Sequence, residues 1–128
     1  IWLRAGNDTA NGHMARGTGL LEKQDLHGAI HAFTAAIRAD PDFAEAYNQR
    51  AMAYYLLERF AEGKADCQIA VTLMPHHFGA WSGLGHCHAC LGEIDLAIKA
   101  YRRAKRINPH LECIDALIEE LQASRNSQ

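Results

Sequence analysis

The three prolines of this chain are evenly spaced. Pro41, Pro75 and Pro109 follow one another at intervals of 34 residues. A fixed period of this length is typical of stacked supersecondary units, each of which buries its apolar face against its neighbour. The chain is therefore expected to fold as a linear stack, and its functional surface should be a groove along the stack rather than an enclosed pocket.

Alignment on the prolines gives three units, each with two amphipathic helical patterns. In the second unit Tyr47, Ala51 and Tyr54 recur at three- and four-residue steps, the period of a helix with one apolar face. Proline ends each unit because it disfavours helical geometry in the residue before it. The predicted organisation is an N-terminal stub over residues 1–9, units over 10–43, 44–77 and 78–111, and a capping helix with its tail over 112–128.

Small residues recur beside large ones at equivalent positions of the units. Gly17, Ala51 and Gly85 are equivalent, and the bulky residues Phe33 and Tyr101 recur beside them. This pattern predicts two helices that approach closely and interdigitate.

A second comparison concerns the turn inside each unit. Gly92 suits the left-handed geometry of a helix C-terminus, whereas Glu58 fills the same slot in unit two, so that turn should be strained or differently shaped.

These features together resemble the tetratricopeptide repeat family. Its repeat has 34 residues, an aromatic residue early in the first helix, Leu-Gly after it, small residues in the second helix and a final proline. The resemblance covers residues 10–111 and implies an all-α fold, a right-handed α-solenoid of antiparallel helix pairs. Unit three matches best, with Trp81, Leu84, Gly85, Gly92, Ala97, Tyr101, Ala104 and Pro109, whereas His13 replaces the early aromatic residue in unit one.

The resemblance also implies a binding surface, because in this family the first helix of each unit lines the concave face. The amide, thioether, phenol and imidazole groups at these positions suit contact with a peptide backbone and with apolar side chains. The implied role is a non-enzymatic protein–protein interaction scaffold that binds a peptide or partner helix in the groove. The predicted peptide-binding residues are Met14, Thr18, Asn48, Gln49, Met52, Tyr55, Ser82 and His86, with Asn11, Leu21, Gly83 and Cys90 at neighbouring positions.

One subtype of the family has characteristic charged residues, which can be compared with this sequence. Members that hold the acidic C-terminus of heat-shock chaperones use Lys and Asn in the first helix, Asn in the third, and Lys and Arg in the fifth. A carboxylate clamp needs cationic donors. The sequence predicts that this function is absent, because the matching positions are Met14, Thr18, Gln49, Gly79 and Gly83.

A metal- or redox-responsive module is the alternative hypothesis. Cys87 and Cys90 have Cys-x-x-Cys spacing, and His86 lies beside them, a combination of ligands that suits zinc. A structural zinc site usually takes four ligands from two segments, and no second Cys-x-x-Cys is present. Cys87 also falls at a small interior position, so a metal-free reading without cofactors is preferred. His27 and His31 lie four apart but lack the intervening Glu of a metalloprotease motif, and we expect them on the convex face.

Charge and composition narrow the remaining function classes. The formal net charge of -2 gives no footprint for nucleic acid or an anionic membrane, and no apolar run approaches the length of a membrane span. No catalytic motif is present, so no enzymatic activity is predicted. The cysteine content favours a reducing compartment such as the cytoplasm. The remaining basic run is expected to form a solvated face, partly neutralised by the capping helix: Lys99, Arg102, Arg103, Lys105 and Arg106.

The segments outside the three units carry predictions of their own. After Pro109, one apolar stripe on an otherwise acidic segment predicts a helix over residues 110–124 that caps the stack, followed by a frayed tail from Asn126. Because the chain opens at Ile1 rather than Met, we expect a fragment or a processed product, and export of the protein is not excluded. Trp2 and Leu3 are expected to belong to a preceding helix. Self-association through the end faces or the convex patch is a further alternative. The capping stripe comprises Ile114, Leu117, Ile118 and Leu121.

Overall fold

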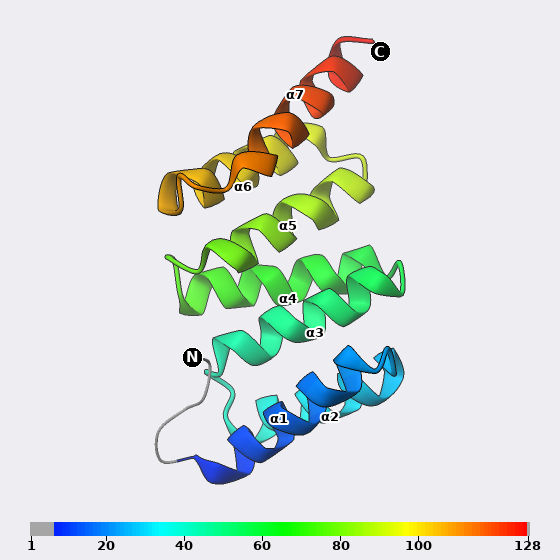
Figure 1. The fold of residues 1–128 in the computed structure, drawn as a ribbon, viewed down its shortest axis with the longest axis vertical. Coiled ribbons are helices and arrows are strands. Elements are labelled where there is room, and N and C mark those ends of the chain that lie inside the picture. Colours follow the sequence, from blue (N-terminus) through cyan, green and yellow to red (C-terminus); the bar gives the residue numbers. More distant parts are fainter. Residues whose placement is uncertain (1–6, 128) are drawn as a thin grey trace.

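The computed structural model describes residues 7–127, and within this range it contains seven helices and no strand. The helices stack one above another along the long axis of the molecule, from α1 and α2 at one end to α7 at the other (Figure 1). Their bounds are α1 Asp8–Glu22, α2 Leu26–Ala39, α3 Ala44–Leu56, α4 Phe60–Leu73, α5 Phe78–Cys90, α6 Ile94–Ile107 and α7 Glu112–Asn126.

The first six helices form three pairs. α1 packs on α2, α3 on α4 and α5 on α6, and consecutive pairs join through α2–α3 and α4–α5 contacts. The first helices also touch one another in order, α1 against α3 and α3 against α5. They therefore form one continuous side of the stack. The predicted all-α solenoid of antiparallel helix pairs is confirmed.

Each pair reverses direction at one left-handed residue. φ is 63° at Gln24, 60° at Glu58 and 77° at Gly92. Positive φ is uncommon for a residue with a Cβ, so the expected strain at Glu58 is present, and Gln24 shares it. The turns do not differ in shape, however. In each turn, the N–H of the residue after the left-handed one donates to the equivalent carbonyl of the first helix, at 2.9 Å. The three bonds run from Asp25 to Leu20, from Arg59 to Tyr54 and from Glu93 to His88.

The predicted interdigitation of small and large residues is seen in units one and three. A Cβ built on Gly17 would lie 2.5 Å from Cε1 of Phe33, and one on Gly85 would lie 2.6 Å from the Tyr101 ring. Both rings are buried. Glycine is needed at these two positions because the ring of the second helix occupies the space of a side chain on the first.

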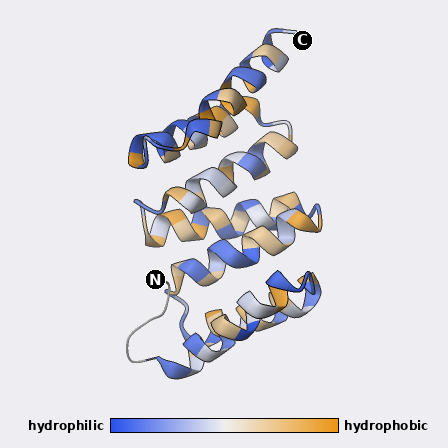
Figure 2. Ribbon diagram, in the orientation of Figure 1, coloured by the Kyte–Doolittle hydropathy of each residue, from blue (hydrophilic) through white to orange (hydrophobic). Residues whose placement is uncertain are grey.

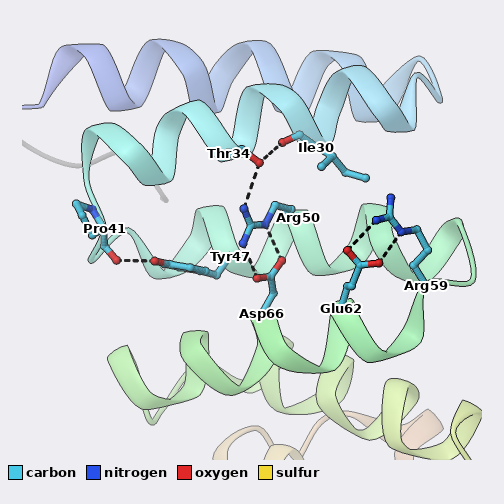
Figure 3. Close-up of polar contacts among 8 residues, drawn as sticks. All are labelled: Ile30, Thr34, Pro41, Tyr47, Arg50, Arg59, Glu62 and Asp66. Carbon is cyan, nitrogen blue, oxygen red and sulfur yellow. Dashed lines mark hydrogen bonds and ion pairs between the residues drawn. The ribbon is translucent and has the colours of Figure 1, made fainter.

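An ion pair joins α3 and α4 and extends to α2 (Figure 3). Nε and Nη2 of Arg50 each donate to a carboxylate oxygen of Asp66 at 2.7 Å. Nη1 donates to Oγ1 of Thr34 at 3.1 Å, and that hydroxyl donates to the carbonyl of Ile30 at 2.7 Å. The hydrogen bond with Asp66 raises the pKa of Arg50. Unit one is thereby tied to unit two by polar contacts as well as by packing.

Helix α7 covers the open face of unit three. Ile114 is buried against Ala97 and Tyr101, with Leu117, Ile118 and Leu121 packed around them. The basic face is partly neutralised as expected, since Nζ of Lys105 lies 3.1 Å from a carboxylate oxygen of Asp115.

The two ends of the described chain differ in detail from the sequence prediction. α7 continues through Asn126, so the tail predicted to fray from that residue is helical there. At the other end α1 begins at Asp8, where the Asn7 side chain accepts the N–H of Ala10 at 3.1 Å and caps the helix. The prediction for Trp2 and Leu3 lies outside the described residues.

Hydrophobic and hydrophilic positions are interleaved along the helices (Figure 2). This distribution fits helices that each bury one face of the stack. No helix in residues 7–127 combines the length and the apolar character that crossing a membrane requires.

Candidate binding groove

A pocket of about 200 Å³ opens between the first helices of units two and three. α3 and α5 form its sides, and Cys67 of α4 contributes to its lining. The lining is mostly apolar and carries a few polar groups, as in many binding sites. Its residues are Asn48, Ala51, Met52, Tyr55, Cys67, Gly79, Ser82, Gly83, His86 and Cys87.

The pocket lies where unit two departs from the pattern of its neighbours. Where units one and three place the rings of Phe33 and Tyr101, unit two has Cys67. Ala51 accordingly replaces the glycine that those rings require. Gly83 of α5 adds no side chain either, and a Cβ there would lie 3.1 Å from Sγ of Cys67. The pocket, here called the α3–α5 pocket, therefore lies where the repeat pattern would place an aromatic ring.

The α3–α5 pocket is uncharged. Its ten lining residues include no Asp, Glu, Lys or Arg. Burial lowers the pKa of His86, whose Nδ1 is hydrogen-bonded to the hydroxyl oxygen of Tyr101 at 2.6 Å. The His86 and Tyr55 ring centroids lie 5.8 Å apart. At neutral pH the pocket thus presents aromatic, thioether and thiol groups with a neutral imidazole.

Two buried thiols, Cys67 and Cys87, contribute to the lining. The hydrogen bond to Cys87, together with burial, raises the pKa of Cys67 far above its ordinary value. A neutral buried thiol is a poor nucleophile and behaves as a small hydrophobic group. Cys67, a free cysteine, therefore packs as a small hydrophobic group, whereas the hydrogen bond with Cys67 lowers the pKa of Cys87.

The residues of the metal hypothesis do not converge. Cys87 is buried close to Gly63 and Cys67, whereas Cys90 is exposed, and His86 is engaged with Tyr101. Among residues 7–127 no three His, Cys, Asp or Glu side chains lie where they could hold a metal ion together. His27 and His31 are both exposed on α2.

The predicted groove residues separate into three groups. Asn48, Met52, Tyr55, Ser82 and His86 all line the α3–α5 pocket. A second group lies between α1 and α3, where Oγ1 of Thr18 is 3.0 Å from Oε1 of Gln49. Met14 stands alone, and its predicted place in the groove differs from what the structure shows. Met14 is fully buried in the core of unit one, because its side chain packs with Phe33 and Ala10 rather than facing the groove.

A polar network borders the pocket and was not foreseen from the sequence. The Asn48 and Gln49 amides donate to Oε1 of Glu45 at 3.2 and 3.4 Å, and Nε2 of His77 bonds to its other oxygen. Nδ1 of His77 also caps α5 by accepting the N–H of Ala80 at 3.1 Å. Burial alone would raise the pKa of Glu45, but the hydrogen bonds from His77 and the amides lower it overall. The network fixes the Asn48 side chain at the pocket.

Four pocket residues were missed as lining residues by sequence reasoning: Ala51, Cys67, Gly79 and Cys87. One signal was available for Cys67, since its alignment with Phe33 and Tyr101 marks a missing ring. For Gly79 the sequence indicates only a position that lacks a charge. The consequence of that small residue appears only when α5 is placed beside α3.

Comparison with protein families gives one consistent result. Two models, both described as tetratricopeptide repeat, match residues 14–73 and residues 79–111. Together these ranges cover well over half of the chain, and they include every residue that lines the α3–α5 pocket.

Curated relatives are longer than this chain. A TPR repeat-containing protein of Rhizobium etli is 28% identical over 97% of the chain, which spans 63% of that protein. Human RNA polymerase II-associated protein 3 is 33% identical over 64% of the chain, which spans 12% of that protein.

Solved structures share the fold across nearly the whole chain. The first TPR of Spaghetti, bound to the HSP90 peptide SRMEEVD, has a TM-score of 0.92 and 24% identity, and 98% of each chain is covered. At this identity the likeness is one of fold. The seven helices described in this chain are consistent with three repeats and a capping helix.

Proposed function

The chain belongs to the tetratricopeptide repeat family, and on that basis we propose that it is a non-catalytic module which binds a peptide segment of a partner protein along α1, α3 and α5. The α3–α5 pocket carries this proposal, because it is a concave, mostly apolar site whose rim holds hydrogen-bonding groups. The Asn48 amide and Ser82 hydroxyl supply donors and acceptors for a peptide backbone.

The chemistry of the groove argues for a partner other than an acidic chaperone tail. The HSP90 peptide in the Spaghetti structure ends in EEVD. Recognition of such carboxylates calls for cationic donors. At the five positions where the family resemblance places the clamp, this chain has Gly79 and Gly83 on α5, Thr18 and the buried Met14 on α1, and Gln49 on α3.

This exclusion is tested by titrating the protein with SRMEEVD in a calorimeter. We expect a Kd weaker than about 1 mM. A matched variant, Gly79→Lys with Gly83→Arg, should bind at least about tenfold more tightly, since each charge-assisted hydrogen bond contributes about 1.5–3 kcal/mol. Micromolar binding by the unmodified chain, unchanged in the variant, would show that the acidic tail is held by other residues and that the exclusion is wrong.

Peptide binding itself is tested by selection from a random peptide library displayed on phage. The variant Asn48→Ala, Met52→Glu, Tyr55→Ala should lose the selected peptides, because it removes rim contacts and charges the pocket. The control His27→Ala, His31→Ala changes exposed residues of α2 and should keep them. Selection of no binders, or equal binding by the groove variant, would contradict the proposal.

A further inference from the structure

We propose that the α3–α5 pocket holds one aromatic side chain of the bound peptide, which anchors the peptide in the groove. The proposal rests on the peptide-binding function above and names the part of the ligand that this site would select.

The position of the pocket is the first argument. In units one and three the rings of Phe33 and Tyr101 are buried against Gly17 and Gly85. Unit two has Cys67 in the equivalent place, and the pocket lies beside it. The fold therefore already accommodates an aromatic ring at this register, and a ring supplied by a ligand would occupy the side of the stack on which the first helices meet.

The size of the pocket is the second argument. An apolar cavity of about 150 Å³ holds benzene. The α3–α5 pocket has about 200 Å³ and opens to the surface. It is therefore large enough for one aromatic side chain, which can enter from a peptide lying across α3 and α5.

The charge and chemistry of the lining select the occupant. A pocket without formal charge favours an uncharged side chain, because a buried charge without a partner is costly. Rings make favourable contacts with thioether sulfur and with other rings. Met52, whose side chain is half exposed at the pocket, and the Tyr55 and His86 rings provide both kinds of contact.

The repeat pattern supplies a variant that fills the pocket from within. Ala51→Gly with Cys67→Phe copies the Gly17–Phe33 pair of unit one and should place a ring in the pocket while keeping the fold. The control is Gln68→Phe, which adds the same ring at the next residue of α4, where the side chain is exposed. Gly83→Leu is a second blocking variant, made from α5, in case the first does not fold.

The first readout is indole binding followed by amide NMR shifts. Indole should shift residues that line the pocket, and the filled variant should bind it at least tenfold more weakly, whereas Gln68→Phe should bind it as well as the unmodified protein. Indole that binds elsewhere, or equally well to both blocking variants, would overturn the proposal.

The second readout uses the peptides selected from the library. They should share one Phe, Tyr or Trp whose replacement by Ala weakens binding at least tenfold, and the filled variant should lose them. Peptides without a required aromatic residue, bound equally by the filled variant, would overturn the anchor and leave the peptide-binding function intact. Failure to select any peptide would overturn both, and retained indole binding would then identify only a small-molecule pocket.

Discussion

Single residues decide where this stack is strained and where it is open. Gln24 and Glu58 adopt the left-handed conformation that Gly92 adopts in unit three. A Cβ makes this conformation unfavourable, by roughly 1–2 kcal/mol per residue. Elsewhere, one exchange of an aromatic ring for the thiol of Cys67 is associated with the α3–α5 pocket. Residue identity thus changes local energy and surface shape while the helix geometry stays the same.

The turn strain gives a prediction for Glu58→Gly. The substitution should raise the free energy of unfolding by about 0.5–1 kcal/mol, because relief of the left-handed strain exceeds the entropy that glycine adds to the unfolded chain. Urea unfolding followed by circular dichroism measures it. Glu119→Gly, at an exposed helical position of α7, is the control and should destabilise by about 1 kcal/mol. Equal losses from both substitutions would mean that the Glu58 turn is unstrained.

At the scale of helices, polar contacts fix how the pairs stack. Arg50 of α3 bonds to Asp66 of α4 and Thr34 of α2, so that one side chain joins three helices (Figure 3). Its bidentate geometry is the stronger form of carboxylate recognition. Asp66 is nearly fully buried, with 5% of its side chain exposed. Loss of the guanidinium would therefore leave a carboxylate without its partner in the interior.

The prediction at this scale is that Arg50→Met destabilises the protein by about 3–5 kcal/mol, because an uncompensated buried charge remains. The double variant Arg50→Met, Asp66→Leu should recover most of that loss, since apolar replacement of both partners is often neutral. Both free energies follow from urea unfolding. A double variant no more stable than the single one would show that the cost arises from packing around Arg50 and not from the Asp66 charge.

At the scale of the whole molecule, α7 covers one end of the stack. A stack of repeats ends in an open apolar face unless a polar-sided helix closes it. Here α7 buries Ile114 against Ala97 and Tyr101. Tyr101 in turn bonds to His86, so the cap supports a helix that lines the α3–α5 pocket.

Removal of residues 112–128 should therefore lower the free energy of unfolding by at least about 3 kcal/mol or cause aggregation, because several apolar side chains become exposed. Ile114→Ala, a smaller change at the same contact, should cost about 2–5 kcal/mol. Thermal unfolding and light scattering check both. A truncated chain that stays monomeric and equally stable would show that α7 does not cap the stack.

The helix pairs and the capping helix follow from patterns in the amino-acid sequence. Three signals specify them: the periodic prolines, the small residues that face rings, and the apolar stripe after Pro109. Each signal can be interpreted within one helix or one helix pair, without knowing how the pairs pack on one another. The aligned positions also identified Asn48, Met52, Tyr55, Ser82 and His86, which the structure brings to one pocket. That these residues bind a peptide remains a prediction.

The burial and the contacts of those positions depend on how the helices pack together. Met14 is buried rather than exposed because Phe33 packs beside it, and Glu45 meets His77 across 32 residues of sequence. The α3–α5 pocket depends on the separation of two helices from different repeats, so no single repeat encodes it. Helical periodicity fixes the face on which a residue lies, whereas burial and open space depend on the side chains that neighbouring helices place opposite it.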